Sequence, residues 1–324
     1  MISRRRFLVT AAALPTIVAV RPAPAAAASL EIAVPPGLPA VYFHRLVRTD
    51  PTLAGHKLAL RNWRDPGQLR TWVASSRISA AASPTNVAAN LHNRGIRAGL
   101  LDVSIWGLLH VIIADGDGQG GLEQLRGTRV GIPFRDDMPD VVFRRLLRAN
   151  GIEPGADFEA VYLGTPVEAA QMFLARRLDA LVLPEPAATM VRHRSAGLGI
   201  RLAEIDLQRL WARQFDQEPG LPQAGTLALP TLTEDDPSLT EALSESIADA
   251  VGWVGSHPGA AAEAAADAVG LPASALAEAI ERARVDYRPA TVSRPALESF
   301  FERVAELEPD LIGGKLPDDT FYLA

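Results

Sequence analysis

The sequence predicts an α/β protein with two similar lobes, each a mostly parallel sheet flanked by helices, and a helical C-terminal part. Three observations predict this class. Short apolar runs alternate with helical patterns along residues 30–200. Residues 39–94 match residues 139–194 without a gap at 13 of 56 positions, and prolines and a glycine recur in register. This repeat is longer than a solenoid unit and about the size of half a domain pair, so it indicates two lobes.

The N-terminus has the composition of an export signal. Arg4-Arg5 precedes an apolar run over residues 9–20, and small residues fill positions 25–28. The pattern resembles a twin-arginine signal, with an ordinary secretory signal as the alternative, and the run is too short to span a bilayer. We expect cleavage near Ala28. Because the chain has no cysteine, we expect neither a lipid anchor nor a disulfide.

Composition and charge exclude several function classes. The chain is 48% hydrophobic and 22% charged, as globular proteins are. Residues 1–28 hold four arginines and no acid, so their removal leaves 28 basic and 38 acidic residues and a net charge of −10. This balance argues against a nucleic acid or an anionic membrane surface as a partner.

Each predicted lobe contains three units of strand, turn and helix, and a proline begins each helix. In the first lobe we expect strands at 30–34, 57–62 and 78–82 and helices at 39–48, 66–75 and 84–92. In the second lobe we expect strands at 129–132, 158–163 and 180–183, and helices beginning at Pro139, Pro166 and Pro186.

The segments between and after the lobes predict how the lobes are joined. Residues 111–114 and 224–229 read as two crossing strands, which would form a two-segment hinge. The first lobe would then comprise residues 29–113 and 225–324, and the second lobe residues 114–224. Helices are expected at 239–256, 258–269, 272–283 and 295–307.

Three motifs resemble those of a known protein family. Residues 122–133 (LEQLRGTRVGIP) are similar to the motif L-x-x-L-x-G-x-x-V-G-x-P. Residues 147–154 are similar to the motif L-x-x-x-G-L-x-P. Residues 178–186 are similar to a segment of that family with an Asp-Ala pair and a later proline. Together they resemble bacterial periplasmic solute-binding proteins of the nitrate/sulfonate/taurine branch, over most of residues 30–230. The resemblance implies the periplasmic-binding-protein-like fold. It also implies an exported, monomeric substrate-binding component of an ABC-type importer, whose partners are a small-molecule ligand and a membrane permease.

Ligands of open α/β sheets bind beyond the carboxyl ends of the strands, where helix N-termini carry free N–H groups. The strand-to-helix turns of both lobes should therefore line a cleft. The expected ligand-binding residues of the first lobe are Pro36, Gly37, Leu38, Trp63, Arg64, Ser83, Pro84, Thr85 and Asn86. Those of the second lobe are Phe134, Arg135, Asp136, Asp137, Met138, Gly164, Thr165 and Glu185.

Several of these residues also have a structural interpretation. Ser83 and Thr85 could cap a helix, and Asp136 and Asp137 could be acids that the helix dipole favours. Two carboxylates after V-G-x-P would repel a sulfonate or nitrate. Either Arg135 compensates for them, or the ligand is not a simple oxyanion.

The ligand class stays open at this point. The arginine and aromatic residues suit a small organic anion such as a sulfonate or carboxylate, which the resemblance favours. The carboxylates suit an amine-bearing heterocycle such as a thiamine-precursor pyrimidine. No catalytic motif and no histidine pair at metal-binding spacing is present, so we predict no enzyme activity, no metal and no cofactor. An enzyme on the same fold and a receptor-docking ligand sensor are the alternatives.

Overall fold

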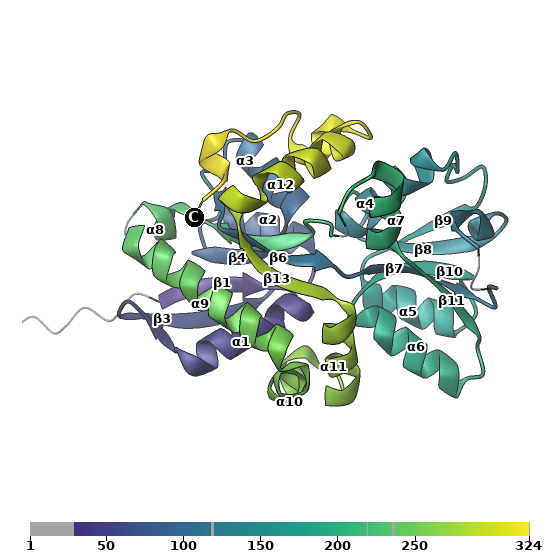
Figure 1. The fold of residues 1–324 in the computed structure, drawn as a ribbon, viewed down its shortest axis with the longest axis horizontal. Helices are drawn as coiled ribbons and strands as arrows, with labels where there is room; N and C mark the ends of the chain where they lie inside the picture. The colour runs from purple at the N-terminus through teal and green to yellow at the C-terminus, as the bar shows by residue number, and fades with distance from the viewer. Residues whose placement is uncertain (1–28, 118–119, 219, 235–236, 324) are drawn as a thin grey trace, which may run out of the picture.

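The computed structural model describes residues 29–117, 120–218, 220–234 and 237–323. The predicted export signal lies outside these residues. Within them the strands form two sheets with helices on both sides (Figure 1). The expected α/β class with two lobes is therefore confirmed.

The strands of the larger sheet are β1 (Ser29–Val34), β2 (Thr52–Leu53), β3 (His56–Asn62), β4 (Ala80–Pro84), β5 (Gly99–Leu100), β6 (Asp102–Gly107), β12 (Ala224–Ala228) and β13 (Arg284–Pro289). Their order is β13-β6-β12-β4-β1-β3-β2, with β5 paired to β12. The strands of the smaller sheet are β7 (Leu109–Ala114), β8 (Arg129–Pro133), β9 (Glu159–Leu163), β10 (Ala180–Pro184) and β11 (Leu202–Asp206). Their order is β11-β7-β10-β8-β9.

The internal repeat corresponds to a repeated structural unit. In the larger sheet β1 pairs in parallel with β3 and β4, and in the smaller sheet β8 pairs in parallel with β9 and β10. The helices of the first unit are α1 (Leu38–Thr49), α2 (Pro66–Ala74) and α3 (Thr85–Asn93). Those of the second unit are α4 (Met138–Ala149), α5 (Pro166–Leu174) and α6 (Ala187–Gly197).

Outside the repeated unit the strands run antiparallel, so both sheets are mixed rather than mostly parallel. The antiparallel pairs include β12 with β4 and β6, and β7 with β10 and β11. The reason is topological: β7 and β12, the first strand after each crossing between the lobes, run against the direction of the βαβ units.

The first crossing lies earlier than the sequence indicated. β6 belongs to the larger sheet and β7 to the smaller one, so the chain crosses at Leu108 and not within residues 111–114. Residues 101–114 are mostly apolar on both sides of Leu108, so periodicity alone gives no sign of a change of sheet. The second crossing lies between α7 (Leu207–Phe215) and β12.

The C-terminal part is helical but contains a strand that we did not predict. Its helices are α8 (Pro230–Thr233), α9 (Pro237–Ser256), α10 (Pro258–Val269), α11 (Ala273–Arg282) and α12 (Ala290–Ala305), and β13 lies between α11 and α12. Short 3-10 helices occur at Leu122–Leu125, Pro309–Ile312 and Asp319–Phe321. No described helix is long and apolar enough to cross a membrane.

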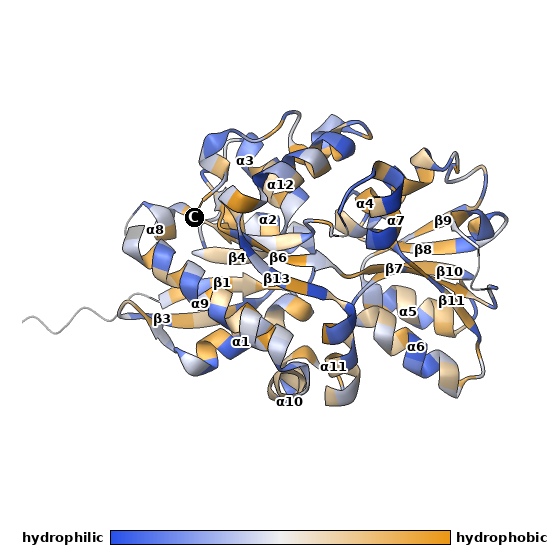
Figure 2. Ribbon diagram, viewed as in Figure 1, coloured by the Kyte–Doolittle hydropathy of each residue, from blue (hydrophilic) through white to orange (hydrophobic). Residues whose placement is uncertain are grey.

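Buried apolar side chains of the strands and helices form the core. Figure 2 shows that central strands such as β7 and β10 are hydrophobic. The largest cluster of buried apolar residues contains Trp63 of the first lobe and Phe143 of the second, together with Phe300 of α12. The C-terminal part therefore packs into the core of the molecule. One apolar cluster therefore supports the strand-to-helix turns of both repeated units.

Candidate functional site

A cavity of about 660 Å³ lies between the two lobes. The turns that join strand to helix in both repeated units line it, as expected for the carboxyl ends of parallel strands. Its size is that of a small-molecule site.

Twelve of the seventeen expected ligand-binding residues line this cavity. They are Pro36, Gly37, Leu38, Trp63, Arg64, Ser83, Pro84, Phe134, Asp137, Met138, Thr165 and Glu185. The structure thus brings together turns that are far apart in the sequence. Whether these residues bind ligand stays a prediction.

The other five expected residues lie outside the lining, for separate reasons. The Thr85 hydroxyl donates to the Pro222 carbonyl at 2.5 Å, and Asn86 is buried beside it on α3. The Arg135 guanidinium stacks on the ring of Tyr162 and is largely exposed. Asp136 forms an ion pair with Arg144. The Gly164 N–H donates to the Glu168 carboxylate.

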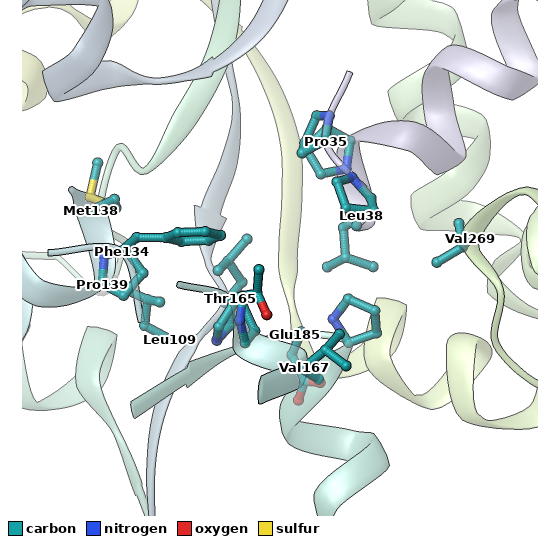
Figure 3. Close-up of a pocket in the computed structure, with 18 of the residues that line it drawn as sticks. Pro35, Leu38, Leu109, Phe134, Met138, Pro139, Thr165, Val167, Glu185 and Val269 are labelled. Carbon is teal, nitrogen blue, oxygen red and sulfur yellow. The ribbon is translucent and has the colours of Figure 1, made fainter. Parts of the chain in front are cut away.

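The lining is predominantly apolar. Figure 3 shows Phe134 and Met138 on one side of the cavity, with Leu38 and Val269 opposite. Trp63 is 5% exposed, and its indole N–H donates to the Ala82 carbonyl, so its polar edge is occupied by the protein. The cavity therefore offers aromatic and aliphatic walls to a ligand.

The helix N-termini at the cavity supply fewer N–H donors than we expected. Pro39, Pro66, Pro139 and Pro166 occupy the first or second position of α1, α2, α4 and α5, and proline has no N–H. The Gln68 N–H is taken by the Asp65 side chain, and the Glu168 N–H by Thr165. A small bare oxyanion, which needs several converging donors, is poorly served by these helix ends.

Asp137 is held by an arginine of the other lobe. Its carboxylate accepts hydrogen bonds from both terminal nitrogens of Arg70, at 2.5 and 3.4 Å. Arg70 lies on α2 and Asp137 precedes α4, so the ion pair joins the two lobes beside the cavity. Burial raises the pKa of Asp137 above its ordinary value, against the opposing effect of Arg70.

Glu185 is engaged in a second ion pair that joins the two lobes. Its buried carboxylate accepts from Nε of Arg282, on α11, at 2.6 Å and from the Thr189 N–H at 3.0 Å. Arg282 also pairs with Glu204, and His110 lies between the two acids, 2.8 Å from Glu204 and 3.7 Å from Glu185. Burial raises the pKa of Glu204, but its neighbours His110 and Arg282 lower it below the ordinary value overall.

The remaining charges in the lining are positive. Arg64 comes from the first lobe and Arg194 from α6 of the second, and both are exposed. Neither forms an ion pair with the residues that the structure describes, whereas both carboxylates of the lining do. The cavity can therefore pair an acidic group of a ligand with an arginine from either lobe.

Part of the lining was not predicted from the sequence. This part comes from the first crossing and the start of β7, from α5 and α6, from the second crossing, and from the end of α10 with the loop that follows. Its residues include Leu108, Leu109, Val167, Gln171, Met190, Arg194, Gln223, Val269, Gly270 and Leu271. Arg194 matches Arg94 in the repeat, but this does not indicate which one faces a cleft. Gly270 has a φ of 73° and ends α10. The sequence could therefore indicate a helix end at Gly270, but not that this helix end lies at the cavity.

A resident metal ion finds no support in the described residues, where no three His, Asp or Glu side chains are grouped so as to hold one. The chain as a whole contains no cysteine.

The comparisons with known proteins agree with this architecture. A model of the NMT1-like family matches residues 109–269. An ABC transporter structure from Parabacteroides distasonis has a TM-score of 0.76 and 21% identity, covering 91% of this chain and 99% of that one. The ligand-binding component of an ABC-type import system from Staphylococcus aureus, with zinc bound, has a TM-score of 0.72 and 13% identity, covering 92% and 96%.

The periplasmic aliphatic sulphonate-binding protein of Escherichia coli has a TM-score of 0.68 and 16% identity, covering 92% of this chain and 93% of that one. No curated protein matches the chain in sequence. The resemblance expected from the motifs is confirmed at the level of the fold: the chain has the two-lobed architecture of ABC-type solute-binding proteins.

Proposed function

We propose that this chain is the exported substrate-binding component of an ABC-type importer and that it captures a small organic acid between its lobes. The observation that carries the proposal is the cavity, which is apolar and in which the charges left unpaired by the described residues are arginines. An apolar body would pack against the aromatic and aliphatic walls, and its acidic group would pair with Arg64 or Arg194.

The same observation favours one of the two ligand classes left open by the sequence. An amine-bearing heterocycle would need a free carboxylate, but Asp137 and Glu185 are already paired with Arg70 and Arg282. The scarcity of helix N–H donors argues against a bare oxyanion such as nitrate. An acid with an apolar body, such as an organic sulfonate or carboxylate, fits both facts.

The other parts of the proposal rest on the sequence and the fold. The signal-like N-terminus supports export to the periplasm with cleavage near Ala28, and the lack of cysteine supports a protein without a lipid anchor. Binding without catalysis, delivery to a membrane permease and a monomeric state complete the proposed role. Ligand-induced closure would draw its free energy from contacts with both lobes.

The test is calorimetric titration of the mature protein with benzenesulfonate, benzamide and benzylamine, which share a ring and differ in charge. We expect the acid to bind and the amine not to bind. The double variant Arg64→Gln/Arg194→Gln should weaken acid binding about tenfold or more. Arg213→Gln, an exposed arginine on α7 outside the cavity, is the matched control.

Native mass spectrometry of protein purified from its own periplasm gives an independent readout, because a released small molecule would have a measurable mass. If benzylamine binds more tightly than benzenesulfonate, the ligand class is an amine and not an organic acid. Failure of every compound, together with an empty purified protein, would overturn the uptake role.

A further inference from the structure

A second cavity, of about 250 Å³, lies on the outer side of the first lobe, between α1, α10 and the end of α9. α1 and α10 lie side by side there (Figure 1). The lining includes Arg45, Arg48 and Trp253, with a floor of small apolar residues such as Ala261. It shares no residue with the cavity between the lobes.

The two arginines of this second cavity have no carboxylate partner among the described residues. Arg45 stacks on the indole of Trp253 at 4.1 Å, and Arg48 donates to the Ala264 carbonyl at 3.2 Å. The lining contains no Asp or Glu. A pair of guanidinium groups beside a cavity, in a chain with an excess of acids, is a place where an anion would be stabilised.

The internal repeat shows what occupies the equivalent place in the second lobe. Arg145 and Arg148 correspond to Arg45 and Arg48. Arg145 also stacks on an aromatic ring, that of Phe215, at 4.6 Å, and Arg148 also donates to a backbone carbonyl, that of Glu306, at 2.9 Å. The two lobes therefore place this arginine pair in the same kind of surroundings.

Arg145 is more buried than Arg45 and also donates to the Arg303 carbonyl, but the difference in charge between the two arrangements is one carboxylate. In the second lobe, the Glu306 carbonyl accepts a hydrogen bond from Arg148. The Glu306 carboxylate pairs with the Arg145 guanidinium at 2.5 Å. In the first lobe, Arg48 donates to the carbonyl of Ala264, which has no carboxylate. Ala264 instead lines the second cavity.

We propose that the second cavity is a binding site for a small organic carboxylate, whose acid group takes the place that Glu306 fills in the other lobe. Arg45 and Arg48 would bind the carboxylate, and the apolar floor would take a short carbon body. This site is separate from the one between the lobes, and it does not depend on the proposed transport role.

The repeat also supplies the test. Ala264→Glu places a carboxylate next to the carbonyl that Arg48 uses and so recreates the arrangement of the second lobe. Ala264 is exposed on α10, and glutamate favours helix, so the variant should fold. Ala268→Glu, one turn further along the exposed face of α10 and outside the lining, is the matched control.

The probe is 4-fluorobenzoate, and its binding is followed by fluorine NMR. Because the cavity between the lobes is also expected to bind an aromatic acid, every protein in this test carries Arg64→Gln/Arg194→Gln. We expect binding in this parent and in its Ala268→Glu variant, and at least about tenfold weaker binding in its Ala264→Glu and Arg45→Gln/Arg48→Gln variants. Equal binding in the Ala264→Glu variant and the parent, or no binding in the parent, would overturn the proposal.

Discussion

At the scale of single residues, Phe134 has a strained backbone conformation and also lies in the wall of a cavity. Its φ is 57°, in the left-handed region that bulky side chains avoid, and its ring lies in the wall of the cavity between the lobes (Figure 3). The turn is held by hydrogen bonds from the Phe134 N–H to the Leu163 carbonyl and from the Asp137 N–H to the Phe134 carbonyl. A strained backbone at a cavity wall is typical of functional positions.

We therefore expect Phe134→Ala to weaken binding of whichever acid binds this cavity by about tenfold to a hundredfold, because the aromatic wall is lost. Phe134→Gly should lose binding equally but unfold at higher urea than Phe134→Ala, since glycine accepts a positive φ at about 1 kcal/mol less cost. Calorimetry and urea titration measure the two effects. If both variants bind the acid as tightly as the wild type does, the Phe134 ring is not part of the binding site.

Asp102 is a fully buried acid in the core of the first lobe. Burial raises its pKa to about 6, against the lowering effect of hydrogen bonds from Ser104 and Thr226. A raised folded-state pKa means that the folded protein holds this proton more tightly than the unfolded chain. Its contribution to stability is therefore complete below pH 4 and is lost as pH rises through 6.

Asp102→Asn should remove this dependence. We expect the stability of the variant relative to the wild type to rise by roughly 3 kcal/mol between pH 4 and pH 8, since a change of two pKa units corresponds to that free energy. Urea unfolding at several pH values measures it, and the difference between variant and wild type cancels the other acids. A difference that stays constant with pH would show that Asp102 does not titrate in this range.

At the scale of the elements, the repeat made the βα units and the turns at the cavity predictable. Elements outside the repeat were harder: β11 and β13 are short strands with charged residues interspersed, and β13 lies among alanine-rich helices. The partners of the cavity carboxylates could not be predicted. Arg70 and Arg282 are 67 and 97 residues away from Asp137 and Glu185, and only the packing of one lobe on the other brings them together.

The Arg70–Asp137 pair links α2 to the start of α4 and so joins the lobes. Asp137 is 6% exposed, and Arg70→Gln would leave a buried carboxylate with a weaker partner. We expect a loss of roughly 3 kcal/mol in the free energy of unfolding, and partial recovery in Arg70→Gln/Asp137→Asn. Arg61→Gln, which breaks the half-exposed Arg61–Glu31 pair within the first lobe, should cost less than about 1 kcal/mol.

Urea unfolding of the four proteins measures these values, and small-angle scattering reports whether the lobes separate. If the double variant is as unstable as Arg70→Gln alone, the cost does not come from the unpaired carboxylate. If Arg61→Gln is equally damaging, the pair between the lobes has no special role.

At the scale of the whole molecule, both crossings meet at one buried side chain. Oε1 of Gln208 accepts from the Leu109 N–H at 2.8 Å and from the side chain of Gln223 at 2.9 Å. Its Nε2 donates to the Leu109 carbonyl at 3.0 Å. Leu109 follows the first crossing and Gln223 ends the second, so Gln208 couples the two segments about which the lobes would rotate.

Gln208→Leu would leave the Leu109 N–H and carbonyl without these partners, at a cost of about 2–4 kcal/mol. Because the lost contacts are at the crossings and not in either lobe, we also expect a wider range of lobe separations in scattering and weaker ligand binding.

Gly107→Ala should act in the same direction, since its Cβ would lie 2.7 Å from Cγ of Gln208 and displace it. Gln214→Leu, exposed on the same helix, should change neither property. If the Gln208→Leu variant is destabilised but scattering and affinity do not change, Gln208 supports the core only. The lobes would then be coupled through the Arg70–Asp137 and Arg282–Glu185 pairs at the cavity.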